Sequence, residues 1–194
     1  IQSMSGKLIY LMGPSGSGKD SLIDAVRPYL ARRGCEVIQR VITRSPAALG
    51  EEARGVSVEE FQVLKAQGAF ALHWQANGLE YGIPVQIDEW LRAGRHVLVN
   101  GSRGHLKHAR ERYPDLLPIM LRVETPVLQQ RLLARGRETR EEIFARLERN
   151  RSFLETTQAM HGERIHLLDN SAALSSAVQR LLAIIDEGIK TGSA

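Results

Sequence analysis

Short apolar runs alternate along the chain with longer segments in which apolar residues recur every three or four positions. The short runs predict buried strands at residues 7–12, 36–42, 96–99, 117–123 and 164–168. The longer segments predict helices at residues 19–31, 57–66, 84–92, 103–112, 125–134, 139–160 and 174–187. Strands alternate with helices in this way in α/β proteins that are built on a parallel sheet.

Capping and turn residues mark several ends of these elements. Residues 57–60 and 139–142 each match the capping box, in which Ser or Thr is followed three residues later by Glu, and this pattern begins a helix. Two further apolar runs, 70–74 and 79–81, flank the dipeptide Asn77-Gly78, which is typical of a tight hairpin turn. We therefore expect one β-hairpin between the second and third helices.

The strongest local signal is Gly13-Pro-Ser-Gly-Ser-Gly-Lys19, which matches the phosphate-binding loop G-x-x-x-x-G-K. It comes directly after a predicted strand and directly before a predicted helix. Glycines let successive backbone N–H groups turn inward, so that they bind the β-phosphate of a nucleotide together with the helix N-terminus. Lys19 is expected to reach the β- and γ-phosphates during phosphoryl transfer. We expect ATP to be bound by Gly13, Pro14, Ser15, Gly16, Ser17, Gly18, Lys19, Asp20 and Ser21.

The residue after this lysine departs from the usual pattern. The Ser or Thr that normally ligates Mg²⁺ is replaced by Asp20, and Ser21 comes one position later. Asp20 could hold the Mg²⁺ directly or through water, because Mg²⁺ prefers oxygen ligands and retains water. Alternatively, the charge of Asp20 serves only to stabilise the N-terminus of the helix.

Length and composition restrict the class of protein. The chain has 194 residues, which suits one domain, and 43% of them are hydrophobic, enough for a packed core. We expect a single domain over residues 4–194, with residues 1–3 as an expression remnant before the first Met. No apolar run approaches the roughly 20 residues that span a bilayer, so no membrane partner is expected. Cys35 is the only cysteine, which excludes an internal disulfide and points to the cytoplasm.

Arginine is unusually frequent, with 21 Arg against 5 Lys and a net charge of +4. Arginine binds phosphate bidentately, although a codon bias towards arginine explains the count equally well. Seven of the arginines lie between Arg131 and Arg151, where they alternate with glutamate and are not interleaved with aromatic residues. We therefore expect no nucleic-acid partner.

Segments along nearly the whole chain, from Lys7 to about Ile185, resemble guanylate kinases in the same order and at similar spacing. They are Gly13–Lys19, Thr43-Arg44-Ser45-Pro46, Glu59-Glu-Phe61, residues 77–82 with Tyr81-Gly82, Arg135-Gly-Arg137, Glu141-Glu142 and Ala145-Arg146. The resemblance implies an α/β P-loop kinase fold of three layers with a five-stranded parallel sheet. It also implies a small substrate-binding insert at about residues 40–82 and an Arg-bearing lid at about residues 135–141.

The departures from this family concern the recognition of guanine and its phosphate. Ala47 stands where guanylate kinases carry a second phosphate-binding Arg, and no Tyr follows Gly55-Val56. Leu72 occupies the place of a Glu that accepts hydrogen bonds from guanine, and residues 100–103 replace a base-reading Asp. A missing acceptor leaves buried guanine donors unpaired, at about 1–3 kcal/mol each. We therefore expect that this protein does not recognise guanine.

Three segments resemble the ribose 1,5-bisphosphate phosphokinases of phosphonate catabolism, which are relatives of the guanylate kinases. They are the phosphate-binding loop with Asp20, residues 99–103 and residues 168–171. The resemblance implies Mg²⁺-dependent phosphoryl transfer from ATP to ribose 1,5-bisphosphate, giving 5-phosphoribosyl 1-diphosphate and ADP. A guanylate kinase and a binding module without catalysis are the alternatives. The expected partner is thus a small phosphorylated sugar, and the sequence specifies no oligomeric state.

The resemblance also implies roles for individual residues. Arg44 would bind a substrate phosphate, and Tyr81 would lie near it. Arg137 and Arg146 would act on the transferring phosphoryl group. Arg135 either shares that work or stabilises the end of its helix.

Other polar residues lie at the carboxyl ends of predicted strands, where α/β sheets bind ligands. Arg103 either binds the second substrate phosphate or caps the next helix. Asp169 and Asn170 follow the last strand, near the place where relatives hold adenine. His105 and His108 have helical spacing but no apparent third metal ligand, so we expect them to be surface residues.

Overall fold

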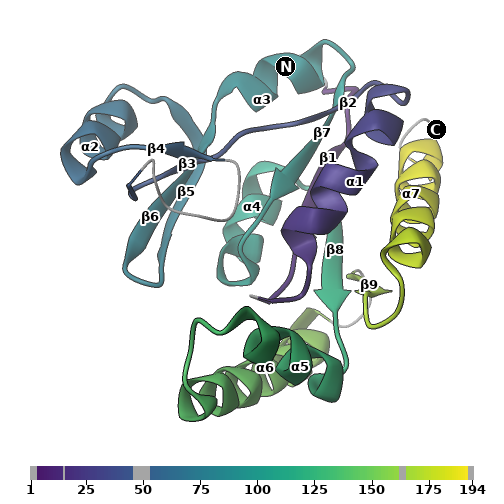
Figure 1. Ribbon diagram of the computed structural model, residues 1–194. Coiled ribbons are helices and arrows are strands. Elements are labelled where there is room, and N and C mark those ends of the chain that lie inside the picture. Colours follow the sequence, from purple (N-terminus) through teal and green to yellow (C-terminus); the bar gives the residue numbers. More distant parts are fainter. Residues whose placement is uncertain (1–3, 15, 46–52, 162–164, 192–194) are drawn as a thin grey trace.

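The computed structural model describes residues 4–14, 16–45, 53–161 and 165–191, and its centre is a five-stranded sheet (Figure 1). The strands of this sheet are β1 (Leu8–Met12), β2 (Cys35–Val37), β7 (His96–Asn100), β8 (Leu117–Arg122) and β9 (His166–Asp169). Their order is β2-β7-β1-β8-β9, and every neighbouring pair is parallel. The predicted α/β class and the five-stranded parallel sheet are confirmed.

Helices cover both faces of this sheet. They are α1 (Lys19–Ala31), α3 (Gln86–Arg92), α4 (Leu106–Arg112) and α7 (Leu174–Thr191). Side chains alternate along β1: Leu8, Tyr10 and Met12 join the core with α3 and α4, whereas Ile9 and Leu11 join the core with α1 and α7. A strand that is buried on both faces needs apolar residues at every position, which is the pattern of β1. The three layers are therefore helix, sheet and helix.

A second sheet with its own helix projects from one side of the main sheet (Figure 1). It consists of β3 (Val41–Ile42), β4 (Arg54–Gly55), β5 (Phe70–Ala76) and β6 (Leu79–Pro84), in the order β4-β3-β6-β5, and of α2 (Val58–Ala66). A small apolar core holds it together, in which Phe61 of α2 stacks on Phe70 of β5 with ring centroids 4.7 Å apart. We call this unit the insert.

Two predicted elements differ from the structure at the border of the insert. The run 36–42, expected as one strand, is split between β2 of the main sheet and β3 of the insert. Residues 38–40 carry the chain from one sheet to the other, which apolar character alone does not reveal. Pro84 ends β6 instead of starting a helix, and α3 begins at Gln86. Pro84 lies beyond the residues that pair with β3, so its missing N–H interrupts no pairing on that side.

The predicted turns and caps are confirmed. Asn77 and Gly78 have φ values of 54° and 74°, as the tight turn between β5 and β6 requires. The Glu60 N–H donates to Ser57 Oγ at 3.0 Å at the start of α2. Thr139 and Glu142 make the reciprocal contacts of a full capping box.

Two further helices, α5 (Thr125–Arg135) and α6 (Arg140–His161), form a pair at the carboxyl end of the main sheet (Figure 1). Leu128 and Leu132 of α5 pack against Ile143 and Leu147 of α6. Gly136, with φ at 68°, ends α5, so the loop 136–139 joins the two helices. Among the helices that the structure describes, none combines the length and the apolar character needed to span a membrane.

Candidate active site

A cavity of about 970 Å³ opens between the loop after β1, the insert and the helices α5 and α6. It lies at the carboxyl ends of the parallel strands, where this class of sheet binds ligands. Its cationic side chains are Lys19, Arg40, Arg103, Arg131, Arg135, Arg146 and Arg149. Asp20 is the single acidic side chain among the described residues of its wall. Such a wall selects ligands that carry several negative charges.

The loop between β1 and α1 has the conformation that phosphate binding requires. Gly16 and Gly18 both adopt the left-handed conformation, with φ at 82° and 83°. A Cβ atom on Gly16 would lie only 2.7 Å from Leu132 Cδ2, so close packing also requires glycine here. Lys19 Nζ donates to Gly13 O at 3.3 Å, across the mouth of the loop. Ser15 falls outside the described residues.

The same loop is supported from behind by β9 and α5. Asn170 is buried and donates from Nδ2 to Ser17 O at 2.7 Å. Arg131 of α5 donates to Asn170 O at 2.8 Å and to Ser17 O at 3.4 Å. Asp169 accepts from the Ser171 N–H at 2.7 Å, and hydrogen bonding by the side chain and then the backbone of Ser171 lowers the pKa of Asp169. Neither Asp169 nor Asn170 lines the cavity, so a direct contact of these two residues with adenine stays a prediction.

The first turn of α1 carries the oxygen groups that suit Mg²⁺. Asp20 and Ser21 are exposed and line the cavity directly after Lys19. Within the described part of the chain, no cluster of three or more His, Cys, Asp or Glu side chains could hold a metal on its own. Mg²⁺ that is held mainly by phosphate oxygens and water needs only one or two carboxylates, and Asp20 fits that requirement.

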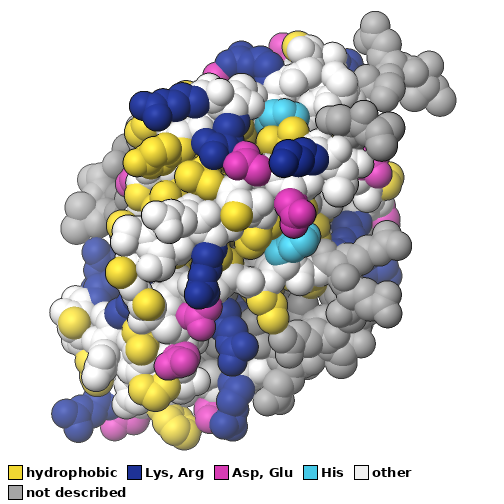
Figure 2. All heavy atoms as spheres, turned by 90° about the vertical axis from the view of Figure 1, so that its right-hand side faces the viewer, with side chains coloured by type: hydrophobic (Ala, Val, Ile, Leu, Met, Phe, Trp, Pro, Cys, Tyr) yellow, Lys and Arg dark blue, Asp and Glu magenta, His cyan; other side chains and the backbone are white. Residues whose placement is uncertain are grey.

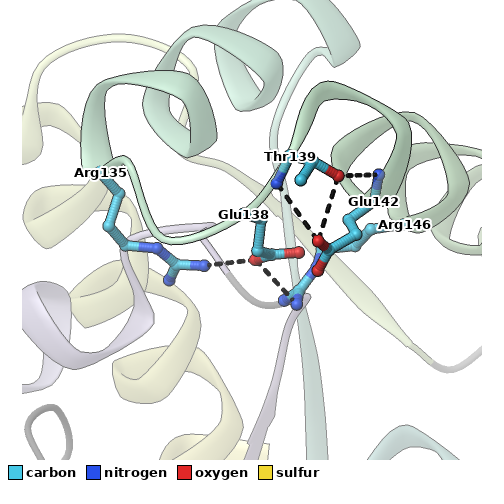
Figure 3. A network of polar contacts seen from close by, with 5 residues as sticks. All are labelled: Arg135, Glu138, Thr139, Glu142 and Arg146. Atoms are coloured by element: carbon cyan, nitrogen blue, oxygen red, sulfur yellow. Dashed lines mark hydrogen bonds and ion pairs between the residues drawn. The ribbon is translucent and has the colours of Figure 1, made fainter.

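A single carboxylate joins two arginines of the helical pair α5 and α6. Glu138 Oε1 lies 3.0 Å from Arg135 Nη2 and 2.9 Å from Arg146 Nη2 (Figure 3). Both arginines line the cavity, and the side chain of Glu138 is only 13% exposed. Arg137 lies in the same loop but is exposed and does not line the cavity. Of the predicted lid arginines, the structure thus brings Arg135 and Arg146 to the cavity.

The insert contributes an aromatic wall on the opposite side. The rings of Trp74 and Tyr81 stack with centroids 5.6 Å apart and 5° between their planes. The guanidinium of Arg40 lies 4.8 Å from the centroid of Tyr81, a cation–π contact. Arg44 is half-buried and does not line the cavity, so the structure places Arg40 there instead.

The aromatic wall continues to His105, which stacks on Trp74 at 5.3 Å. The pKa of His105 is lowered to about 4, mainly by burial and secondarily by the charge of His108. The prediction of a surface position is therefore wrong for His105, which is half-buried, and correct for His108. The reason is that His105 belongs to a 3₁₀ turn, η1 (Arg103–His105), which directs it towards the insert rather than towards solvent.

The loop after β7 forms the floor between these two walls. Gly101 approaches Tyr10 so closely that a Cβ atom would lie 2.3 Å from the ring. The Tyr10 hydroxyl donates to Ser102 O at 2.8 Å and accepts from the Ser102 N–H at 3.0 Å. Burial raises the pKa of Tyr10, so the hydroxyl keeps its proton and remains a donor. Arg103 donates to Asn150 Oδ1 at 2.9 Å, which links the loop to α6.

The cavity unites most of the residues expected from the sequence. Its wall includes Gly13, Pro14, Gly16, Gly18, Lys19, Asp20, Ser21, Tyr81, Arg103, Arg135 and Arg146. Ser17 is fully buried behind the loop. Sequence reasoning missed Arg40, Trp74, Arg131, Arg149 and Asn150. Only Arg131 carried a recognisable signal, since it lies on a predicted helix, four residues before Arg135.

A phosphate-binding loop at the end of a parallel sheet, together with an insert and an arginine-bearing helical pair, defines the class of P-loop kinases. The sequence model of the family described as guanylate kinase matches residues 5–185. This chain therefore belongs to the guanylate kinase family.

Two relatives match nearly the whole chain, and a solved structure shares its fold. It is 60% identical over 185 residues to a ribose 1,5-bisphosphate phosphokinase PhnN of Pseudomonas fluorescens, covering 95% of this chain and 97% of the relative. It is 59% identical over 182 residues to the protein of the same name from Azotobacter vinelandii, covering 94% and 97%. A crystal structure of guanylate kinase from Anaplasma phagocytophilum has the same fold, with a TM-score of 0.68 and 17% identity over 96% of this chain and 87% of that one.

Proposed function

We propose that this protein transfers the γ-phosphoryl group of ATP to the 1-phosphate of ribose 1,5-bisphosphate. The products are 5-phosphoribosyl 1-diphosphate and ADP. The observation that carries this proposal is the distribution of cations in one cavity. Lys19 and Arg131 contact the phosphate-binding loop, whereas Arg40 contacts the end of β7 and Arg103 lies in the loop that follows it. The names of relatives at 59–60% identity support the same reaction.

The donor side of the cavity binds the triphosphate. Backbone N–H groups of the loop and Lys19 hold the β- and γ-phosphates. Arg135 and Arg146 line the same cavity as the loop and stabilise the charge on the transferring group, as arginines do in other phosphoryl-transfer enzymes. We assign Arg137 a weaker contribution, because its exposed side chain lies outside the cavity. Mg²⁺, held beside Asp20, supplies charge neutralisation between the phosphates.

The transfer itself needs no strong base from the protein. An oxygen of the 1-phosphate attacks the γ-phosphorus, and the bond from that phosphorus to the bridging oxygen breaks as ADP leaves. The attacking oxygen already carries charge near pH 7, because the second pKa of a phosphate monoester is about 6. Catalysis then depends on alignment and on neutralising the repulsion between two anions. The cationic wall of this cavity is suited to both tasks.

Among the described residues, neither place at which the family resemblance locates guanine recognition puts a carboxylate in the cavity wall. Leu72 is buried in the apolar core against β6 and lies away from the cavity wall. The floor at residues 100–103 offers no carboxylate. Guanine has N–H donors that need acceptors when buried, so GMP would bind here without that compensation.

A nucleic-acid partner is not part of this proposal. Figure 2 shows the side of the molecule on which α7 lies, where basic, acidic and hydrophobic side chains are interspersed. Binding to a phosphate backbone favours a continuous basic patch instead. We place the enzyme in the cytoplasm, a compartment in which a buried free thiol such as that of Cys35 stays reduced.

The test is a product assay with the purified chain, ATP and Mg²⁺. Ribose 1,5-bisphosphate and GMP are offered in parallel, and 5-phosphoribosyl 1-diphosphate, GDP and ADP are quantified. We expect the sugar bisphosphate to be the better acceptor by a wide margin in kcat/KM. A preference for GMP would establish the guanylate kinase alternative, and failure to bind ATP would establish a non-catalytic module.

A further inference from the structure

We propose that Arg40 binds the 5-phosphate of ribose 1,5-bisphosphate and thereby selects a bisphosphate over acceptors with one phosphate. This inference rests on the proposed function and deepens it. No resemblance assigned a role to Arg40, because it precedes the segment with Arg44 that resembles the guanylate kinases. The structure brings Arg40 to the cavity and leaves Arg44 outside the cavity wall.

Arg40 is fixed by contacts from two distant parts of the chain. It lies between β2 and β3, where the chain passes from the main sheet to the insert. Its Nη1 donates to Asn100 O at 3.1 Å, at the end of β7. Its guanidinium lies over the ring of Tyr81 in β6. A side chain held from both sides has already lost much of its rotational freedom, so ligand binding costs less entropy.

The stacked arrangement suits anion binding in particular. Stacking on Tyr81 engages the flat face of the guanidinium, whereas the N–H groups of a guanidinium donate along its edges. The ring of Trp74 is parallel to that of Tyr81, and His105 stacks in turn on Trp74. The result is a rigid support for one cation. Arginine, rather than lysine, is the residue that benefits from such a support.

A second cation faces the same floor. Arg103 lines the cavity three residues after Asn100 and is oriented by Asn150 of α6. Each phosphate monoester carries about −1.5 to −2 charge at pH 7, so a ligand with two of them needs two separate cationic groups. Lys19 and the two arginines that pair with Glu138, Arg135 and Arg146, bind the reacting phosphates on the donor side. Among the described cations of the wall, Arg40 is the one that stacks on Tyr81 of the insert, and we assign it to the phosphate at the other end of the sugar.

The experiment compares two acceptors that differ only in the 5-phosphate, ribose 1,5-bisphosphate and ribose 1-phosphate. We expect Arg40→Gln to lower kcat/KM for the bisphosphate about 10- to 100-fold, as for the loss of a charge-assisted contact. Its kcat/KM for ribose 1-phosphate should change less than about threefold. Arg40→Lys should recover part of the loss. Arg54→Gln is the matched control, because Arg54 is an exposed insert arginine that pairs with Glu60.

Calorimetric binding of ribose 1,5-bisphosphate and of ADP separates this inference from the proposed function. If the wild-type protein binds the bisphosphate but makes no product, the proposed function fails. A 10- to 100-fold weaker affinity of Arg40→Gln, with ADP affinity unchanged, would still support the role of Arg40. Equal losses for both acceptors, no loss for either, or a wild-type protein that does not bind the bisphosphate would overturn it.

Discussion

Glu138 Oε1 lies 2.9 Å from Nη2 of Arg146, across the turn that joins α5 to α6. The same oxygen accepts from Arg135 at 3.0 Å, so one carboxylate holds two cavity arginines side by side. Without the carboxylate, these two like charges would repel each other. We therefore expect Glu138 to position the two arginines that we assign to the transferring phosphoryl group.

This relationship predicts the behaviour of Glu138→Gln. The neutral amide keeps the size of the side chain but loses the charge-assisted bonds, which contribute about 1.5–3 kcal/mol each. We expect kcat to fall about tenfold, because the arginines are no longer aligned, with ATP affinity changed less than about threefold. Steady-state kinetics and ATP titration provide the two measurements.

Glu148→Gln is the matched control for that experiment. Glu148 forms an exposed i,i+3 pair with Arg151 on the same helix, and such pairs contribute little. Its kinetics should match those of the wild-type protein. An unchanged or higher kcat in Glu138→Gln would mean that the carboxylate only competes with the nucleotide for the arginines.

Lys19→Ala should abolish turnover without unfolding the protein. Lys19 is half-buried, and its amine donates to the Gly13 carbonyl at 3.3 Å. We expect kcat to fall by at least about 10²–10³-fold, the cost of losing one electrostatic stabiliser of a transition state. The thermal midpoint should stay within about 3 °C, which corresponds to about 1 kcal/mol for a chain of this size. Near-normal kcat would contradict the proposed role of the loop.

The two arginines that flank Gly136 should differ in their effects. Arg135 lines the cavity, whereas Arg137 is exposed beyond the left-handed turn at Gly136. We expect Arg135→Ala to lower kcat about 10²–10³-fold and Arg137→Ala to lower it less than about tenfold. Single-turnover kinetics with saturating ATP isolates the chemical step. The reverse ranking would show that the turn rearranges when both substrates bind.

The sequence predicted the donor side well because its signals are local. The conformation of the phosphate-binding loop from Gly13 to Lys19 is determined locally, because the strand, the glycines and the helix N-terminus are consecutive in the chain. The acceptor side depends on contacts between distant segments. Arg40 enters the cavity only because the chain changes sheets after Ile38 and because Tyr81, some forty residues later, lies beneath its guanidinium. No local pattern encodes such a contact.

The lid arginines show a related limit. The family resemblance implies that Arg137 acts on the transferring phosphoryl group, with Arg135 either sharing that work or stabilising the end of its helix. The left-handed conformation of Gly136 ends α5, so Arg135 lies on the helix and Arg137 lies in the loop 136–139. Where the helix ends therefore separates the surroundings of the two arginines. Which of the two arginines lines the cavity depends on backbone geometry that the residue types do not specify.

The stack of His105 on Trp74 predicts a pH-dependent stability. The pKa of His105 is lowered from 6.5 to about 4, mainly by burial and also by His108 and His73. Between these two values the unfolded chain binds a proton that the folded chain does not, so the free energy of unfolding falls as the pH decreases from 7 to 4. We expect His105→Phe, which keeps the aromatic stack, to lose less stability between pH 7 and pH 5 than the wild-type protein. Urea unfolding at both pH values measures the difference, and His166→Gln is the control, because His166 is exposed. Equal losses in wild type and His105→Phe would show that His105 titrates normally in the folded protein.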